Sequence, residues 1–590
     1  MLWLDERGFM ARCAATLVVL VALSGCYRSA MGDDDDGASV EDGTAWLPPT
    51  APAPLTPALD GAAGSLWAPT RLGSLRPELR WTAGPDDGLG PWSYDVQIDD
   101  SCETSNFADC GFPSPEASGS GIRETRWTPT IDLPVDTTPP VGRRYFWRIR
   151  GCRAEECTLW SLPRLLSVGR VPFDVNGDGY SDLAIGAMGL SIEALAEGGV
   201  LLFFGGPTGL APTPDVVLVN PDHQESALFG SSVSAAGDVN ADGFCDLIVG
   251  ALGQNRGAEN EGNAFLYLGS VDGPHSAPDV VLDNPENFEG GSFGISVAVV
   301  GDVDSDGYAD IVIGTSPGGG LPTGHQESAF EYLGGAEGIR STPDLVIRSP
   351  DWPAEMGDFG FGVAGAGDVN GDGYADVVIG ASWAGSDGFW PGKAHVYYGG
   401  SGGLRSSPDV TLEDPDPGNG FQFGDSIALG DVDGDGYADV VVGARVQDEP
   451  SLHVGSVFVF AGGKSGVART PRGRIDNPLT YLFGDDVAAG DLDRDGDDEV
   501  VVGGADVVFV YDGSPDGIVS DSSTTLDDPT PTLACGTHWT FGFVGDVNAD
   551  GFTDLAMGYL DPSGTSYEPH SVCVYLGRSG EVDPVPAIVL

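Results

Sequence analysis

The chain has 590 residues, of which 89 are acidic and 27 are basic, so its formal net charge at pH 7 is -62. A protein that binds nucleic acid needs a basic surface for the phosphates, and this composition argues against nucleic-acid partners. With 41% hydrophobic residues and 90 glycines, the chain has material for a buried core with many turns.

The first 25 residues have the features of an export signal. Two arginines precede an apolar stretch at 14–23, which is too short to span a bilayer. The sequence Leu23-Ser24-Gly25-Cys26 resembles a bacterial lipobox. This resemblance implies cleavage before Cys26, lipidation of Cys26, and a lipoprotein at the outer membrane or cell surface. An ordinary secretory signal with an incidental cysteine is the alternative.

Residues 26–65 have the composition of a disordered tether. Four aspartates follow one another at 33–36, and prolines recur between 48 and 57. Such a segment cannot bury a core, and its prolines favour an extended spacer. We expect it to hold the folded part of the chain away from the membrane.

Residues 66–170 predict a small β-sandwich, because short alternating strands are separated by polar turns. The order of the strands and the positions of Trp81, Tyr145 and Trp147 resemble a fibronectin type III domain. The cysteines offer local disulfides in an oxidising compartment. The candidate pairs are Cys102 with Cys110 and Cys152 with Cys157, and a further pair in the last repeat is Cys535 with Cys573.

From residue 171 to residue 590 the chain repeats an acidic nine-residue loop seven times. We number these acidic loops one to seven: 174–182, 238–246, 302–310, 368–376, 431–439, 491–499 and 546–554. Side-chain oxygens recur at loop positions 1, 3, 5 and 9, and glycine stands at position 6. A single copy of such a segment can be a solvated turn, but seven copies in register favour a common ligand.

The donor pattern fits calcium, which takes six to eight oxygen ligands in a flexible shell. Zinc or copper would require His or Cys ligands, which the ligand positions lack. The first half of the pattern is shared with EF-hands, but position 12 is apolar and a short β-branched run follows, so we expect calcium loops between strands. Side chains at positions 1, 3, 5 and 9 and the backbone carbonyl at position 7 give up to seven Ca²⁺ sites: Asp174, Asn176, Asp178, Tyr180, Asp182, Asp238, Asn240, Asp242, Phe244, Asp246, Asp302, Asp304, Asp306, Tyr308, Asp310, Asp368, Asn370, Asp372, Tyr374, Asp376, Asp431, Asp433, Asp435, Tyr437, Asp439, Asp491, Asp493, Asp495, Asp497, Glu499, Asp546, Asn548, Asp550, Phe552 and Asp554.

The loops lie inside longer units that predict four strands each. Around loop three, the runs SVAVV, DIVIG, AFEYL and PDLVI are separated by the loop and by turns. Seven units of four strands suit a closed β-propeller. Either each blade is complete and the ring closes by packing, which we favour, or the final segment PVPAIVL completes the first blade.

Phe-Gly precedes six of the loops, and Val/Ile-Gly-Ala follows four of them. With the acidic loops, these motifs resemble FG-GAP repeats over about 420 residues. The resemblance implies an all-β fold with a seven-bladed propeller like that of integrin α-subunits. The unit before Asp174 departs from the pattern because it lacks Phe-Gly, and loop six departs because it has Asp497 at position 7 and ends in Glu499.

No catalytic set is evident in the sequence. The seven histidines form no HExxH pair, and no GxSxG elbow or phosphate-binding loop has the expected context. We therefore expect a calcium-binding, lipid-anchored adhesion module that binds an extracellular protein or glycan and is not an enzyme. An extracellular hydrolase, an accessory domain of one, or a ligandless surface-coat component are the alternatives.

Overall fold

We describe the fold from a computed structural model. The structure describes residues 54–55, 75–77, 79–81, 91–101, 112–153, 156–161, 164–315, 326–351, 357–385, 391–416, 420–449, 452–476, 483–504, 507–515, 517–518, 524–526, 538–560, 569–579, 581–582 and 584–590. The predicted signal with Cys26 lies outside these residues, as do Cys102, Cys110 and Cys535. Among the described residues, no helix is long and apolar enough to cross a membrane.

The N-terminal part forms two antiparallel sheets. One has the order β1-β2-β5, with β1 at Pro54–Leu55, β2 at Leu79–Trp81 and β5 at Arg126–Trp127. The other contains β4 at Ala117–Ile122, β3 at Ser93–Asp99, β6 at Arg143–Arg153 and β7 at Glu156–Cys157, and β8 at Arg164–Val168 also pairs with β6. Because β1 pairs with β2, ordered structure begins inside the segment whose composition predicts a tether.

These two sheets enclose a core of their own, in which Trp81, Tyr145 and Trp147 are buried. The aromatic residues that the sequence analysis singled out therefore hold this domain together. Cys152 and Cys157 form a disulfide, as predicted. Cys573 is also disulfide-bonded.

The repeat region forms seven antiparallel sheets within the described residues, each with its strands in chain order. We call them repeat sheets one to seven. The first four consist of β9 Leu183–Ala187, β10 Gly199–Phe203 and β11 Val216–Val219; β12 Phe229–Gly237, β13 Asp246–Ala251, β14 Asn263–Tyr267 and β15 Val280–Asp283; β16 Ser296–Gly301, β17 Asp310–Gly314, β18 Ser328–Tyr332 and β19 Leu345–Arg348; and β20 Phe359–Gly367, β21 Asp376–Ala381, β22 Lys393–Tyr397 and β23 Val410–Glu413.

The remaining three sheets keep the same order. They consist of β24 Gly420–Gly430, β25 Asp439–Glu449, β26 Leu452–Phe460 and β27 Gly473–Asp476; β28 Val487–Gly490, β29 Glu499–Gly503, β30 Val508–Tyr511 and β31 Thr524–Leu526; and β32 His538–Gly545, β33 Asp554–Leu560, β34 Pro569–Tyr575 and β37 Ile588–Val589. A short hairpin, β35 Gly577–Arg578 and β36 Glu581–Val582, precedes the last strand. The repeat region is therefore all-β and built from repeated four-stranded sheets, as a β-propeller is.

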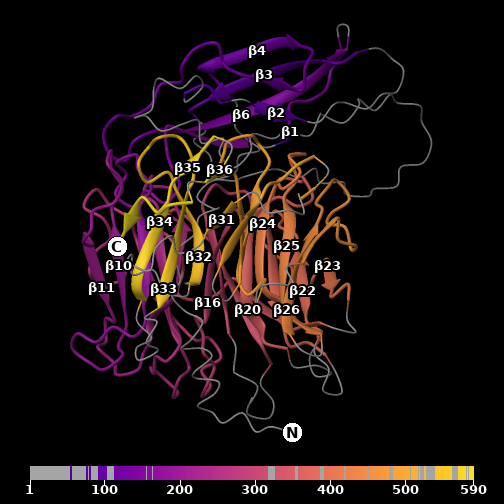
Figure 1. The fold of residues 1–590 in the computed structure, drawn as a ribbon. Helices are drawn as coiled ribbons and strands as arrows, with labels where there is room; N and C mark the ends of the chain where they lie inside the picture. The colour runs from indigo at the N-terminus through magenta and orange to yellow at the C-terminus, as the bar shows by residue number, and fades with distance from the viewer. Residues whose placement is uncertain are drawn as a thin grey trace.

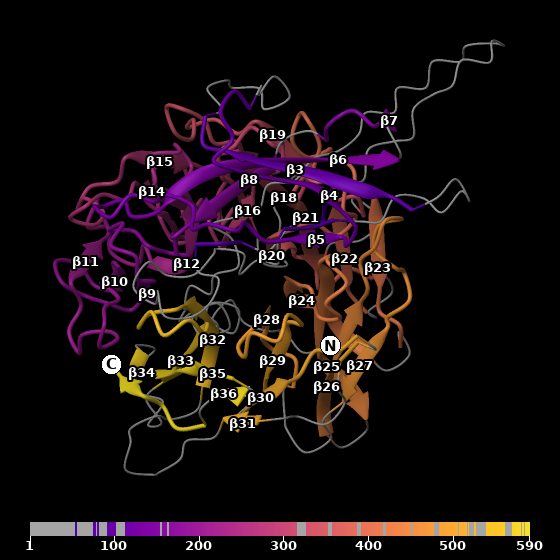
Figure 2. The same cartoon turned by 90° about the horizontal axis from the view of Figure 1, so that it is seen from above.

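The two ends of the repeat region meet, and the sheets surround a common centre (Figure 2). The backbone N–H of Ser181 donates to the carbonyl of Asp546 at 3.2 Å. Leu183 and Phe203 of repeat sheet one share a buried cluster with Val544 and Val574 of repeat sheet seven. The ring thus closes by packing of the last sheet on the first.

The final segment completes the last sheet, because β37 pairs with β34. Repeat sheet one has three strands among the described residues. The residues before loop one pair with β6 of the N-terminal part as β8, which leaves them unable to supply a strand to this sheet. This explains why Phe-Gly is missing before Asp174. We expected every unit to have four strands, and this expectation is wrong for the first sheet as the structure describes it.

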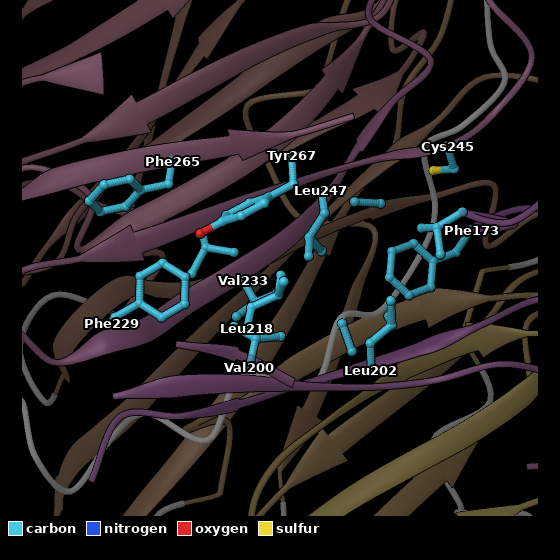
Figure 3. Packing of buried hydrophobic residues seen from close by; sticks show 14 of the residues in the cluster. Phe173, Val200, Leu202, Leu218, Phe229, Val233, Cys245, Leu247, Phe265 and Tyr267 are labelled. Carbon is cyan, nitrogen blue, oxygen red and sulfur yellow. The ribbon is translucent and has the colours of Figure 1, made fainter. Parts of the chain in front are cut away.

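Apolar side chains fill the space between neighbouring repeat sheets (Figure 3). Phe229 from a Phe-Gly motif is fully buried and meets Phe265 edge to face, with ring centroids 5.5 Å apart. The glycine of the following Val-Gly-Ala allows this close packing, because a Cβ on Gly250 would lie 2.1 Å from the carbonyl oxygen of Gly294 on the next sheet. The two motifs therefore serve the contact between sheets.

Candidate metal-binding loops

Loops two to seven each join the first and second strands of their repeat sheets, whereas loop one leads into β9, the first strand of repeat sheet one. All seven lie at one end of the ring, on the face that the N-terminal sheets partly cover (Figure 1). Gly307 at position 6 of loop three has a φ of 92°, a conformation that side chains other than glycine rarely adopt. The turn predicted from the glycine pattern is therefore present.

The carboxylate at position 9 closes each loop. In loop three, Asp310 is fully buried and accepts backbone hydrogen bonds from Val303 at 2.8 Å and from Gly334 at 2.8 Å. The first donor belongs to the loop and the second to the turn that follows the third strand. The same pair of bonds recurs at Asp182, Asp246, Asp376, Asp439 and Asp554, whereas Glu499 has the loop bond.

The side chains at positions 1, 3 and 5 turn inward and hold the loop backbone. The Oδ1 and Oδ2 atoms of Asp302 accept from the backbone N–H groups of Asp306 at 3.0 Å and Gly307 at 2.8 Å. Asp306 in turn accepts from the N–H of Tyr308 at 3.1 Å. The position-7 residues, from Tyr180 to Phe552, are half-buried at the rim of their loops. These bonds give each loop its shape before any ligand is considered.

Three loops bring three carboxylates into mutual reach, with one oxygen of each lying within 4.8 Å of the others. These groups are Asp302, Asp304 and Asp306; Asp431, Asp433 and Asp435; and Asp491, Asp493 and Glu499. In loop two, the Oδ1 atom of Asp238 is buried and accepts no hydrogen bond from the described residues. Converging oxygens and a buried oxygen without a donor fit a hard divalent cation.

Burial and mutual repulsion raise the pKa values of several carboxyl groups in the acidic loops. Burial is the larger cause for Asp304, whose pKa rises to about 7 with Asp306 adding to the effect. Burial likewise raises the pKa of Asp439 to about 8 and that of Glu499 to about 9. The pKa values of Asp302 and Asp310 are also raised well above their ordinary value by burial and by loop neighbours. Crowded carboxylates of this kind stabilise the fold when a cation or a proton neutralises them.

We therefore expect the metal-free protein to become more stable as the pH falls from about 8 to about 5. The folded-state pKa values lie above the unfolded values near 4, so the folded state binds more protons within this window. Stability is lost as the pH rises through the raised values. Thermal melts in a chelator across this range measure the effect, and a lower melting temperature at pH 5 than at pH 8 would contradict it.

The variant Glu499→Gln separates this effect from general surface repulsion. Glutamine keeps an oxygen that accepts from the N–H of Leu492, which lies 2.6 Å from the carboxylate. Because the pKa of Glu499 is raised to about 9, mainly by burial, its removal should flatten the pH dependence of the melting temperature above pH 7. An unchanged slope in that range would assign the dependence to other groups.

The loops are also the joints between neighbouring repeat sheets. The carbonyl of Asp238 accepts from the N–H of Ala309 on the next loop at 3.2 Å, and the carbonyl of Val239 accepts from Gly335 at 3.0 Å. Equivalent bonds link loop one to loop two, loop three to loop four and loop four to loop five. A cation that fixes one loop would therefore also fix its contact with the next sheet. The amino-acid sequence does not predict these hydrogen bonds, because the donor and the acceptor are both backbone groups.

A second set of buried carboxylates escaped the sequence analysis. Glu197 accepts from three consecutive backbone N–H groups, those of Ile192, Glu193 and Ala194, at 2.6–3.2 Å. Although burial opposes it, these bonds and His223 lower the pKa of Glu197 to about 2. Glu261 holds its own loop in the same way. Glu327 instead accepts from the N–H groups of residues 357–359, which lead into the next repeat sheet. The sequence signal that could have identified these three glutamates is their shared position just before the third strand of the unit.

An all-β ring of repeated sheets with an acidic loop at the same place in each unit is the architecture of a β-propeller. The comparisons agree, because four segments match the family described as FG-GAP repeat: 229–267, 293–328, 359–397 and 423–460. These are the parts of repeat sheets two to five that contain the loops. The matches support an integrin-alpha-like propeller for the repeat region.

Curated relatives point the same way. The chain is 39% identical over 165 residues to integrin alpha-IIb of Homo sapiens, which covers 27% of this chain and 15% of that protein. It is 32% identical over 226 residues to integrin alpha pat-2 of Caenorhabditis briggsae, covering 36% and 17%. The chain thus spans less than a fifth of the length of these two integrins.

Two solved structures are more distant. A lectin of Agrocybe aegerita, described as recognising non-reducing terminal N-acetylglucosamine, is 15% identical with a TM-score of 0.40 and covers 71% of this chain and 92% of its own. The exotype rhamnogalacturonan lyase YesX is 14% identical with a TM-score of 0.24, covering 86% and 65%. Neither likeness is close enough to bear on function.

Proposed function

We propose that this protein is a calcium-binding adhesion module, a seven-bladed propeller that engages an extracellular protein or glycan and has no enzymatic activity. The observation that carries the proposal is the likeness of its repeats to integrin alpha chains, together with an acidic loop in every unit. In this account, up to seven Ca²⁺ ions occupy the loops and stiffen the ring, because each loop is bonded to its neighbour.

The arrangement of donors supports calcium as the cation. The loops offer carboxylate, amide and carbonyl oxygens, and the three groups of converging carboxylates contain no His or Cys. Bound calcium would supply positive charge where burial and repulsion now raise the carboxyl pKa values. Calcium would then stabilise the ring without taking part in any reaction.

Among the described residues, the best candidate for a catalytic set is not accessible to a substrate. A hydroxyl–imidazole–carboxylate chain does exist, since His395 lies 3.1 Å from both Thr411 Oγ1 and Asp351 Oδ2. However, the side chain of His395 is 1% exposed and packs beside Phe359, so a substrate has no access to it. We interpret these three hydrogen-bonded side chains as a structural support for the outer strand of repeat sheet four.

Binding of the purified protein to a glycan array and to a panel of extracellular matrix proteins tests the proposed function. We expect one class of ligand to be retained in millimolar calcium and released by a chelator. A variant with alanine at Asp302, Asp304 and Asp306 serves as the matched control and should lose part of this binding. Hydrolysis of a glycoside or ester panel would contradict the proposal, as would equal binding with and without calcium.

We further propose that Cys26 carries a lipid anchor and places the propeller on the outer surface of a bacterial cell. The expected result is that the full-length protein sediments with membranes, whereas Cys26→Ser appears in the soluble exported fraction. A single acyl chain gives weak attachment, so stable sedimentation also reports a second chain. Membrane attachment that survives Cys26→Ser would show another means of attachment.

A further inference from the structure

The N-terminal domain is seated directly on the acidic-loop face at loops one and two. Its sheet lies across one side of the ring and leaves the sector of β25 to β36 uncovered (Figures 1 and 2). The N–H of Val141 donates to the carbonyl of Gly177 in loop one at 2.9 Å. Pro140 approaches loop two so closely that a Cβ on Gly243 would lie 2.7 Å from its Cγ. The contact therefore involves the loop backbone itself.

Two arginines of the N-terminal domain reach the first carboxylate of loop two. Arg144 Nη2 lies 3.7 Å and Arg170 Nη1 lies 3.6 Å from Asp238 Oδ2. The three side chains are 22%, 13% and 4% exposed, so this ion pair is largely shielded from water. Arg144 belongs to β6, and Arg170 follows the end of β8. Both guanidinium groups are thus carried by the N-terminal sheet and not by the ring.

Loop two differs from loops one, three and seven at this carboxylate. In loops one, three and seven, the Oδ1 atom at position 1 accepts from the backbone N–H at position 5, at 2.9, 3.0 and 2.9 Å. The Oδ1 atom of Asp238 is buried and has no such bond within the described part of the chain. The negative charge of the Asp238 carboxylate is balanced by the two guanidinium groups, which lie close to the oxygen that would attract a metal cation.

Loop five provides a useful contrast. There Arg472 contacts Asp433, but this arginine comes from the same repeat sheet and also donates to the carbonyl of Pro515 at 2.7 Å. Its side chain is 36% exposed, so it can withdraw into solvent alone. Arg144 and Arg170 are less exposed than Arg472, and both belong to the N-terminal part of the chain and not to a repeat sheet.

The overall charge distribution favours this seating. Residues 66–170 contain 12 arginines and 14 acidic residues, whereas residues 171–590 contain 12 basic and 66 acidic residues. A nearly neutral domain rich in arginine therefore meets the loop face of a strongly negative ring. Calcium at the loops would reduce the same negative charge that attracts the arginines.

We propose that the N-terminal domain competes with calcium at loop two: its docked Arg144 and Arg170 hold Asp238 in place of the metal, and calcium at this loop loosens the domain. This inference rests on the proposed calcium binding of the acidic loops. Two positive charges within 4 Å of a ligand oxygen repel a divalent cation, so their removal should tighten calcium at this loop by about tenfold or more. Loop two then becomes the weakest calcium site and the one that responds to calcium concentration.

Calcium titration of the whole chain by calorimetry and native mass spectrometry tests the competition. We compare the wild type with Arg144→Gln/Arg170→Gln and with Arg126→Gln, an arginine of the same domain that pairs with Glu124. The double variant should gain one bound ion, or bind one ion about tenfold more tightly, while Arg126→Gln behaves as the wild type. Hydrogen exchange of residues 139–144 gives a second readout, since the N–H of Val141 should exchange faster in saturating calcium.

The outcomes separate this inference from the proposed function. Equal calcium stoichiometry and affinity in the wild type and the double variant would overturn the competition while leaving calcium binding intact. Absence of bound calcium in every variant would overturn both. Asp238→Asn guards against misfolding of the double variant, because it removes the charge from the ring side. In the absence of calcium, Asp238→Asn should speed exchange at Val141. In calcium, its other loops should still bind the ion, and unchanged exchange in the first measurement would also count against the inference.

Discussion

Removal of calcium is expected to lower the melting temperature of the repeat region by about 10 °C or more. At free calcium about 100 times the dissociation constant, each filled loop contributes about 2.7 kcal/mol. For large domains, each kcal/mol shifts the melting temperature by about 2–4 °C. The effect should be cooperative, because backbone hydrogen bonds link most of the loops to the next sheet. Calorimetric melts in calcium and in a chelator provide the measurement.

Magnesium serves as the control in this experiment. It prefers a smaller octahedral shell with several waters, so it should restore less of the lost stability than calcium does. The pH adds a second check, because stability in the chelator should rise on acidification while stability in calcium should fall as protons compete for the ligands. A melting temperature that is the same with and without the chelator would contradict a structural role for calcium.

Asp310→Ala is expected to destabilise the protein by about 2–5 kcal/mol even when no metal is present. The substitution leaves the buried N–H group of Val303 and the half-buried N–H group of Gly334 without their acceptor. It also removes the link between the acidic loop and the turn after the third strand. Denaturant unfolding in a chelator measures this loss.

Asp304→Ala is the matched variant in the same loop. Asp304 is partly exposed and accepts one backbone hydrogen bond, from Asp306 at 3.2 Å. Its substitution should weaken calcium binding at loop three but cost less than about 1 kcal/mol in the chelator. Equal losses for the two variants in the chelator would mean that position 9 has no special role in holding the loop.

Much of the fold was predictable because local signals repeat. Each acidic loop marks a turn between two strands, and the four runs expected around loop three correspond to β16, β17, β18 and β19. The missing Phe-Gly before Asp174 correctly marked an irregular start. The strand before loop one, β8, pairs with β6 of the N-terminal domain and not with repeat sheet one. The sequence around a single loop does not predict which of the two domains such a strand joins.

The sequence predicts candidate ligands for the loops, but it does not predict how the loops are connected to one another. Positions 1, 3, 5 and 9 follow from the spacing of oxygen donors, yet the backbone bonds that join Asp238 to Ala309 involve no particular residue type. In the sequence, nothing distinguishes Arg144 and Arg170 from other arginines in strands and turns. Only the docking of the N-terminal domain places them beside loop two.

A crystal structure determined in millimolar calcium tests the central claim most directly. We predict a metal peak among the carboxylates of loop three and of most other loops, in a closed ring of repeated sheets, with metal–oxygen distances of about 2.3–2.6 Å. Loops that keep the described hydrogen bonds and hold only water at saturating calcium would contradict the account.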